Sequence, residues 1–378
     1  MPSDPVALND LKRHTDSIVD ELRAAAERVL ARGWFVLGPE VEAFEREFAE
    51  YCATSQCVAL GNGTEALELA LRAVGVGPGD QVATAANAGG YSTTAIRALG
   101  GVPVYAEIDD DTLTMSPEAL AGVLTSAVRA VVVTHLYGRM ADMPRLLAAA
   151  DRLGIPIVED CAQAHGAILG GKRAGAWGAI GCYSFYPTKN LGALGDGGAI
   201  VCGDAALAQS VRLLRQYGWS SKYHSSVAGG RNSRLDEIQA AFLRAKLTHL
   251  DGWNTRRRDI AAAYARGLAG LGLRLPDRRG PDDVTHLYVV RSDRRDGLQT
   301  ELAKAGITSA VHYPIADYLQ PGWQDSGQAR GFLPLTEAAC AQVLTLPCYP
   351  ELRDEEVDRV VAATAAAMPA ARLAPAHG

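Results

Sequence analysis

The chain has 378 residues, of which 48% are hydrophobic and 21% charged, enough for a large buried core and a smaller second domain. Its formal net charge of −6 argues against nucleic acid or an anionic membrane as a partner. No hydrophobic signal core and no run of about eighteen apolar residues occurs, so we expect a cytoplasmic protein that does not span a membrane.

The cysteines and acidic clusters do not indicate a metal or a disulfide framework. Seven cysteines lie in apolar or alternating segments without a C-x-x-C pair, which predicts reduced thiols rather than disulfides or a zinc site. Asp109-Asp-Asp111 lacks the glycine and glutamate of a calcium loop, so we interpret it as a solvated turn and expect no metal there.

Two amphipathic helices are expected near the amino-terminal end. Apolar residues recur at helical spacing over residues 18–32 and stop at Gly33, and a second helix is expected from 39 to about 53. Trp34 and Phe35 lie between the two helices. They either pack the helix pair or line a ligand pocket, and both interpretations stay open at this point.

A glycine-rich turn follows the first expected strand, 57–60, and leads into a helix over 65–74. Glycines let the backbone approach an anion, and the first-turn N–H groups lie at the positive end of the helix dipole. We therefore expect Gly63 and Thr64 to form a phosphate cradle. A plain helix cap by Thr64 explains the turn equally well when it is considered alone.

Strands and helices then alternate along the chain. Strands are expected over 81–85, 102–108 and 130–138, and helices over 93–99 and 143–153. This alternation predicts a parallel-rich sheet covered by helices on both faces. His135 falls within the third of these strands and is expected to be a satisfied core histidine.

The most informative residues follow the next two expected strands. The apolar run 155–158 stops at Glu159 and Asp160, and the run 181–186 stops just before Lys189. Open α/β sheets bind ligands at the carboxyl ends of their strands, so Asp160 and Lys189 are expected to face each other across a cleft. Pyridoxal phosphate (PLP) needs such a pair: an amine that forms a Schiff base, and a carboxylate that keeps the pyridine nitrogen protonated. Glu159 is expected to point to the opposite strand face.

The remaining segments predict a functional loop and a second domain. After a helix over 205–217, the polar loop 218–230 carries Lys222, Tyr223 and His224, which suit a diphosphate or a sugar. A long helix is expected from 231 through 250 and past Trp253. We divide the chain into a large α/β domain, 1–252, and a small α+β domain, 253–378. In the small domain we expect helices over 258–271, 296–305 and 354–368, strands over 285–291 and 308–313, and a disordered tail over 369–378.

Taken in order, these motifs resemble a known family. The segments EDCAQAHGA and SFYPTKNLGALGDGGA are similar to those of the DegT/DnrJ/EryC1/StrS family of PLP-dependent sugar aminotransferases. The resemblance extends over residues 36–361 through VLGPEVEAFEREFAEYCA, GNGTEALELAL, VVVTHLYGRMADM, NSRLDEIQAAFLRAKL and HYP. It implies the fold of aspartate aminotransferase, fold type I: α/β with a mostly parallel mixed sheet flanked by helices and a smaller carboxyl-terminal α+β domain.

The resemblance also implies roles for particular residues. Lys189 and Asp160 would be catalytic, and Asn232 would reach the cofactor of the neighbouring subunit in a homodimer with shared active sites. Many members carry an aromatic residue at the position of Gly89, where this chain departs from the pattern, and we expect Tyr91 in its place. The implied cofactor-binding residues are Gly63, Thr64, Tyr91, Asp160, Gln163, Ser184, Lys189 and Asn232. The implied substrate-binding residues are Trp34, Phe35, Tyr186, Lys222, Tyr223, His224, His312 and Tyr313.

The resemblance finally implies a reaction. Members most similar to this chain move an amino group from L-glutamate to a keto group, here expected at C3, of a dTDP-linked 6-deoxyhexose. Amination at C4 or of a free cyclitol ketone is the alternative, and a PLP-binding regulatory protein without turnover is a third interpretation. Related dehydratases place histidine where this chain has Lys189, so the lysine favours transamination.

Overall fold

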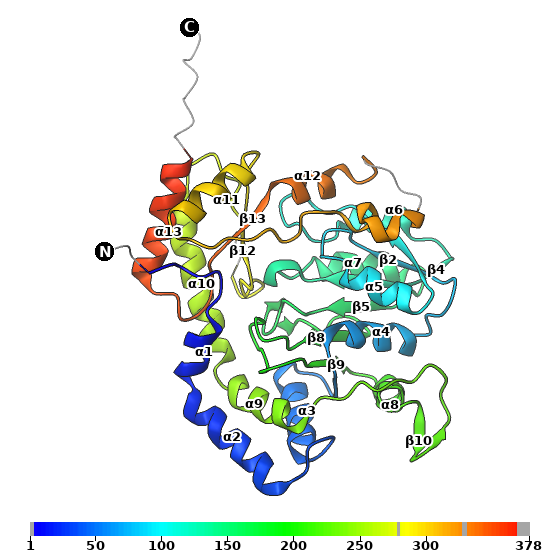
Figure 1. The fold of residues 1–378 in the computed structure, drawn as a ribbon. Coiled ribbons are helices and arrows are strands. Elements are labelled where there is room, and N and C mark those ends of the chain that lie inside the picture. Colours follow the sequence, from blue (N-terminus) through cyan, green and yellow to red (C-terminus); the bar gives the residue numbers. More distant parts are fainter. Residues whose placement is uncertain (1–3, 278–279, 327–330, 369–378) are drawn as a thin grey trace.

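A seven-stranded sheet forms the centre of the computed structural model, which describes residues 4–277, 280–326 and 331–368 (Figure 1). The strand order is β1-β9-β8-β5-β4-β2-β3, and within this sheet β9 alone runs antiparallel to its neighbours. The strands are β1 (Gln56–Leu60), β2 (Gln81–Thr84), β3 (Val102–Tyr105), β4 (Val128–Thr134), β5 (Ile157–Asp160), β8 (Ile180–Ser184) and β9 (Gly198–Cys202). The predicted mostly parallel mixed sheet is confirmed.

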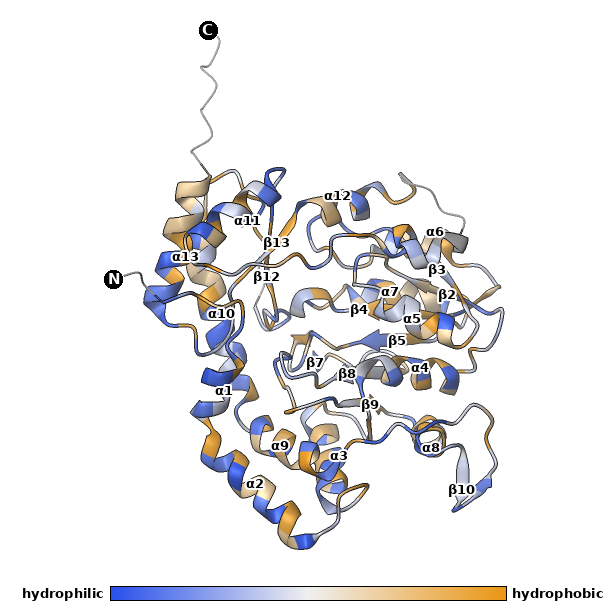
Figure 2. Cartoon of the chain, viewed as in Figure 1, coloured by the Kyte–Doolittle hydropathy of each residue, from blue (hydrophilic) through white to orange (hydrophobic). Residues whose placement is uncertain are grey.

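Helices cover both faces of this sheet because its strands are apolar on both sides. Along β4, Val131 and Val133 pack into one core, while Ala130 and Val132 pack into the other. The first core is covered by α3 (Pro39–Tyr51), α6 (Pro117–Val123), α7 (Met143–Asp151) and α9 (Glu237–Leu247). The second is covered by α4 (Gly63–Ala73), α5 (Tyr91–Ala98) and α8 (Ala205–Leu214). Hydrophobic and hydrophilic residues alternate along these helices in Figure 2, as expected for one buried face.

A second, smaller core lies beside the large sheet. It is built on the antiparallel pair β12 (Tyr288–Arg291) and β13 (Val343–Leu346). The helices that pack into it are α10 (Leu250–Gly267), α11 (Arg295–Lys304) and α13 (Asp354–Ala367). The helix α12 (Pro334–Gln342) and the 3-10 turn at Asp317–Leu319 pack instead against Ala86 and Tyr105 at the edge of the large sheet, and a further 3-10 turn follows at Pro321–Ser326. Val6 is fully buried in this core: its N–H donates to the carbonyl of Gly306 and its own carbonyl accepts from Thr308. The amino-terminal end of the described chain therefore packs with the carboxyl-terminal part.

The amino-terminal helices are α1 (Leu11–Ser17) and α2 (Val19–Arg32). Leu22, Ala25 and Val29 pack α2 against α9. Gly33 ends the helix with φ of 67°, a left-handed conformation that glycine adopts without steric cost, so the predicted end is confirmed. None of the described helices is long and apolar enough to cross a membrane.

Two expected elements differ from the structure, and two hairpins appear that were not expected. The long helix expected from 231 is two helices, α9 and α10, which are separated at Thr248 and His249. The expected strand 308–313 is wrong: only Ala310 pairs with Thr345, and the His312 ring then bonds the Thr345 side chain, so the ladder does not continue. Two short hairpins were not expected, β6 (Ile168–Leu169) with β7 (Lys172–Arg173) and β10 (Trp219–Ser221) with β11 (His224–Ser225).

Other expectations are settled in part. All seven cysteines are buried and free, which confirms the predicted thiols. The division into 1–252 and 253–378 stays a prediction, and its boundary would fall inside α10. The predicted tail 369–378 lies outside the described residues.

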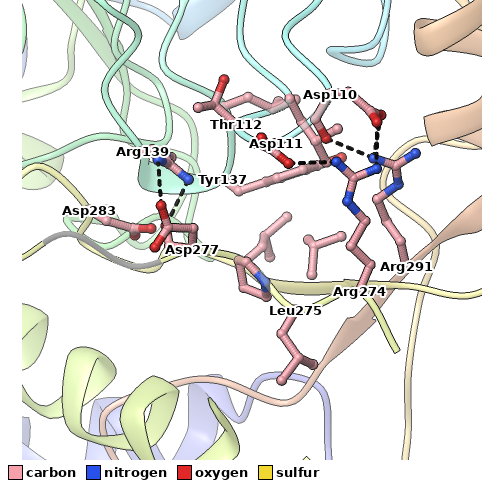
Figure 3. A pocket seen from close by; sticks show the side chains of 15 residues that line it. Asp110, Asp111, Thr112, Tyr137, Arg139, Arg274, Leu275, Asp277, Asp283 and Arg291 are labelled. Atoms are coloured by element: carbon pink, nitrogen blue, oxygen red, sulfur yellow. Dashed lines mark hydrogen bonds and ion pairs between the residues drawn. The ribbon is translucent and has the colours of Figure 1, made fainter. Parts of the chain in front are cut away.

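The acidic turn at 109–111 is not simply solvated, which corrects the prediction. Asp110 accepts from Arg274 at 2.5 Å and from Arg291 at 2.7 Å, and Asp111 accepts from Arg274 at 2.7 Å. Figure 3 shows these ion pairs along a small pocket of about 70 Å³. The Arg291 side chain is only 8% exposed. The turn therefore binds the large sheet to the segment that carries β12.

Candidate active site

The largest set of predicted site residues lines one cavity of about 680 Å³ at the carboxyl ends of the parallel strands. Thr134, Asp160 and Ser184 are the last residues of β4, β5 and β8. The cavity is lined in part by Asn62, Gly63, Thr64, Glu65, Glu68, Tyr91, Thr134, Asp160, Gln163, Ser184, Tyr186, Lys189, Asp196 and Arg231. The structure thus brings the predicted acid and the predicted lysine to the same space, as the rule for open α/β sheets requires.

Asp160 is a buried acid with defined hydrogen-bond partners. One carboxylate oxygen accepts from the Ala162 N–H at 3.1 Å, and the other accepts from the Thr134 hydroxyl at 3.2 Å. Burial raises the pKa of Asp160, while the Ala162 N–H and the charge of Lys189 oppose this rise. Thr134 was not among the predicted site residues, although its place at a strand end could have identified it.

Lys189 follows β8 in a tight turn in which its own N–H donates to the Tyr186 carbonyl at 2.9 Å. The side chain is partly accessible through the cavity. Burial lowers the pKa of Lys189 to about 8, and the nearby Asp160 opposes this shift. An amine with a pKa near neutrality has a useful fraction of free base, which a proton carrier and nucleophile needs.

The amino terminus of α4 lies at the edge of the cavity, where the glycine-rich turn predicts a phosphate cradle. Asn62, not Thr64, caps the helix: its side chain accepts from the Glu65 N–H at 2.9 Å. The Thr64 hydroxyl therefore is not needed for capping. A Cβ added to Gly63 would lie 2.6 Å from the Ser184 Cβ, so only glycine lets the helix start approach the end of β8 this closely.

Gln163 is held by two neighbours at the edge of the cavity. Its side-chain oxygen accepts from the Tyr137 N–H at 2.6 Å, and its side-chain nitrogen donates to the Tyr313 hydroxyl at 3.1 Å. Tyr137 has φ of 61°, which is uncommon for a residue other than glycine, and its hydroxyl donates to the carbonyl of His312. Tyr137 was not predicted, because only tertiary structure places it here.

A second cavity of about 260 Å³ shares Tyr91, Tyr186 and Lys189 with the first. His312 and Tyr313 also line it, as does His286, which was not predicted. The Tyr91 ring packs edge to face against Tyr313 with centroids 6.3 Å apart, and the side chain is 50% exposed. The predicted role of Tyr91 above the cofactor ring stays a prediction.

Six predicted residues line neither cavity of this chain. Trp34 and Phe35 are 55% and 54% exposed, beside the start of α3, whose first N–H groups bond the Glu237 carboxylate. Lys222, Tyr223 and His224 form the exposed end of the β10–β11 hairpin, which extends away from α8 in Figure 1. Asn232 is exposed as well. The structure does not support contact of these six residues with a ligand in their own chain, because the hairpin and the segment before α3 lie outside both cavities.

Glu159 does not line the large cavity, and its carboxylate binds backbone groups instead. It is fully buried and accepts hydrogen bonds from the N–H groups of Gly175, Trp177 and Gly178. The His135 Nε2 bonds the same carboxylate at 2.9 Å, and its Nδ1 accepts from the Ala141 N–H at 3.2 Å. Because both ring nitrogens are used, the interpretation of His135 as a satisfied core histidine is confirmed.

The residues around the large cavity fit PLP. The first turn of α4 with the Thr64 and Ser184 hydroxyls offers donors for a phosphate, Asp160 offers an acid for the ring nitrogen, and Lys189 offers the amine. Bound PLP supplies an electrophilic carbonyl carbon and an electron sink. The absence of a side chain at Gly63 is the feature of the chain that brings the first turn of α4 close to Ser184 at the edge of the cavity.

Comparisons with known proteins agree with this geometry. The pattern that defines the DegT/DnrJ/EryC1/StrS aminotransferase family matches residues 16–365. The dTDP-3-amino-3,4,6-trideoxy-alpha-D-glucose transaminase of Streptomyces venezuelae is 46% identical over 354 residues, 93% of each chain. The crystal structure of S. venezuelae DesV with a ketimine intermediate has a TM-score of 0.93 at 45% identity, covering 96% of this chain and 98% of that one.

A further structure, NtdA from Bacillus subtilis with bound cofactor PMP, has a TM-score of 0.91 at 31% identity and covers 97% of this chain and 86% of that one. The family match, the identity over nearly the full length and the shared fold point to the same conclusion. The chain belongs to the DegT/DnrJ/EryC1/StrS aminotransferase family and is a PLP-dependent enzyme.

Proposed function

We propose that this enzyme transfers the amino group of L-glutamate to the C3 keto group of a dTDP-linked 6-deoxyhexose, making an amino-dideoxy sugar nucleotide. The observation that carries the proposal is the presence of Asp160 and Lys189 in one cavity at the ends of β5 and β8. The relative at 46% identity, named for a dTDP-3-amino sugar, supports the choice of nucleotide and of carbon.

Each residue of the pair has a distinct task in this proposal. Asp160, oriented by the Thr134 hydroxyl and the Ala162 N–H, would hold a proton on the ring nitrogen of the cofactor. Lys189 would accept and return the proton that moves during amino transfer, which its lowered pKa favours. General acid–base help of this kind is typically worth about 10² to 10⁴ in rate.

The proposal includes a homodimer whose subunits complete each other's sites. Asn232 and the hairpin residues Lys222, Tyr223 and His224 are exposed in one chain, as residues that reach a second chain must be. Trp34 and Phe35 add exposed aromatic surface, and aromatic residues are enriched at protein–protein interfaces relative to the rest of the surface. In a dimer these six residues would supply the cofactor and substrate contacts that one chain lacks.

One assay tests the reaction. The enzyme is incubated with PLP and freed of excess by gel filtration, glutamate is added, and a panel of C3-keto, C4-keto and cyclitol-ketone substrates follows. We expect a yellow protein whose absorbance changes with glutamate, and a product whose new amino group NMR locates at C3. An amino group at C4 or on the cyclitol supports those alternatives. A colourless protein contradicts the proposal, and glutamate conversion contradicts a purely regulatory protein.

Subunit mixing tests the shared site. Lys189→Ala and Asn232→Ala homodimers should each be inactive or weak. After mixed refolding, one site of each hybrid dimer combines an intact Lys189 with an intact Asn232, so partial activity should return. Activity that stays at the sum of the separate variants would contradict a contribution of Asn232 across the interface.

A further inference from the structure

The residue directly after Lys189 is the centre of a buried hydrogen-bond network. Asn190 is 3% exposed, and its side-chain nitrogen donates to the Asn254 side-chain oxygen at 2.8 Å and to the Val284 carbonyl at 3.1 Å. Asn254 in turn donates to the His165 carbonyl at 2.8 Å. The network joins the lysine turn to α10 and to the segment before β12.

Two backbone carbonyls fix the orientation of both amides. The carbonyls of Val284 and His165 can only accept, so the amide nitrogens of Asn190 and Asn254 must face them. The Asn190 side-chain oxygen then faces the His286 Nδ1 at 3.0 Å. Because this oxygen can only accept, the His286 Nδ1 must carry a hydrogen.

His286 is neutral, so this hydrogen is the only one on its ring nitrogens. Burial lowers the pKa of His286 well below its ordinary value, and the charges of Lys189 and Arg257 lower it further. A neutral imidazole with a hydrogen on Nδ1 has a lone pair on Nε2. Within the described part of the chain, no residue donates to this Nε2. His286 lines the second cavity together with Lys189.

We propose that His286 is a substrate-positioning residue whose Nε2 accepts a hydrogen bond from an O–H or N–H group bound beside Lys189. The Lys189 amine and the hydroxyls of Tyr91, Tyr186 and Tyr313 also line this cavity and carry hydrogens, and Asn9 and His312 line it as well. What distinguishes His286 is that its bond to Asn190 leaves the Nε2 lone pair as an acceptor. The inference rests on the proposed function for its two sources of donor: the ammonium of glutamate and a hydroxyl of the keto-sugar.

The tautomer is tested directly in the holoenzyme. Protein labelled with ¹⁵N-histidine is measured by NMR, and the His286→Asn spectrum assigns the His286 signals. We expect the hydrogen on Nδ1 and an unprotonated Nε2. A hydrogen on Nε2, or a doubly protonated ring, would overturn the proposal whatever the activity of the enzyme.

The positioning role is tested with a variant that separates the two ring nitrogens. His286→Asn keeps a donor at the Nδ1 position for Asn190 and removes the acceptor at the Nε2 position. The glutamate half-reaction and the keto-sugar half-reaction are measured separately. We expect about a tenfold loss or more in one of them, which is the size of one lost hydrogen bond to a charged or well-oriented group. PLP content and melting temperature should stay at the wild-type values.

Each outcome decides the inference. A loss confined to the glutamate half-reaction identifies the ammonium as the donor, and a loss confined to the sugar half-reaction identifies a hydroxyl. Unchanged half-reactions overturn the proposal, as does a general loss that accompanies lower PLP content and stability. His249→Asn, on the surface beside Glu21, is the matched control and should leave both half-reactions unchanged. If no sugar in the panel reacts, the proposed function fails, while the tautomer and the glutamate half-reaction still decide the role of His286.

Discussion

Gln163 and Tyr313 join two distant parts of the chain, because the Gln163 side-chain nitrogen donates to the Tyr313 hydroxyl at 3.1 Å across 150 sequence positions. Gln163 follows β5 of the large sheet, and Tyr313 belongs to the segment between α11 and the 3-10 turn at Asp317–Leu319. The wall between the two cavities thus depends on contacts from both parts of the molecule.

Removing the Tyr313 hydroxyl should therefore destabilise the protein. Tyr313→Phe leaves the Gln163 nitrogen, which is largely buried, without its acceptor, and an unsatisfied group of this kind costs about 1–3 kcal/mol. Urea unfolding of the cofactor-free protein measures this loss. The exposed Tyr223→Phe is the control and should change the free energy of unfolding little. Equal stability of the two variants would contradict the importance of the bond.

Lys189→Ala should abolish covalent attachment of PLP. Borohydride reduction followed by peptide mass spectrometry should find the cofactor on Lys189 in the wild type and on no lysine in the variant. Transamination should fall by at least about 10², the lower range for loss of general acid–base help. Lys304→Ala, whose amine pairs with Glu301 on the surface, should keep both properties. A Lys189→Ala protein that still carries reduced cofactor would contradict the assignment.

Asp160→Asn should change both cofactor retention and the titration of Lys189. The Asp160 charge opposes the burial that lowers the pKa of Lys189 to about 8, so the pKa of Lys189 should fall below this value in the cofactor-free variant. The pH dependence of Lys189 modification by an amine-reactive reagent measures it. PLP should be lost on gel filtration, because breaking a buried ion pair typically costs about 3–5 kcal/mol. The exposed Asp20→Asn is the control. A pKa that rises or does not move would refute the electrostatic pairing.

Gly63→Ala should weaken the phosphate cradle. The new Cβ would lie 2.6 Å from the Ser184 Cβ, and overpacking of this kind typically costs about 1–3 kcal/mol. We expect weaker PLP binding in a titration and a lower urea midpoint. Gly122→Ala is matched to it as a helical glycine, but nothing lies within 4 Å of its added Cβ. It should be neutral or stabilise by up to about 1 kcal/mol, and similar behaviour of the two variants would exclude the steric explanation.

Asp317 should make stability depend on pH. Burial raises the pKa of Asp317 to about 7, and the hydrogen bond from the Thr93 hydroxyl opposes this rise. Because this pKa is raised in the folded state, the contribution of Asp317 to the free energy of unfolding is complete below the unfolded-state pKa. It is lost as pH rises through about 7. The loss is up to about 4 kcal/mol, at about 1.4 kcal/mol for each pH unit between the two pKa values.

The test is the free energy of unfolding of Asp317→Asn from pH 4 to 8, the interval that contains the raised pKa. The variant should lose this part of the pH dependence, while Asp16→Asn, on the surface beside Lys12, should keep it. Wild-type and Asp317→Asn curves that run parallel over the whole interval would show that the carboxyl group does not titrate there.

The residues that sequence predicts best are those with a local signal. Asp160 and Lys189 each follow an apolar run, and a parallel sheet collects the ends of such runs at one edge. His286 and Tyr137 have no such signal, because only tertiary contacts place His286 in the second cavity and Tyr137 beside Gln163. Asn62 shows a third case: asparagine and threonine both cap helices well, and only the structure shows which of the two does so here.

Errors in the carboxyl-terminal part have a similar origin. Residues 308–313 were expected to form a strand, but only Ala310 pairs with Thr345, and the Thr345 side chain bonds the His312 ring where the ladder would continue. The acidic turn shows the opposite error. Its aspartates look solvated in the sequence because their partners are distant: Arg274 and Arg291 lie 164 and 181 positions from Asp110.

The burial of Val6 has a consequence for how this chain is made. Synthesis on the ribosome proceeds from the amino terminus, yet the partners of Val6, at Gly306 and Thr308, follow it by about three hundred positions. The strands of the large sheet, which end at Cys202, can therefore pair while the nascent chain is still growing, whereas the smaller core stays open at this edge until Gly306 and Thr308 have emerged.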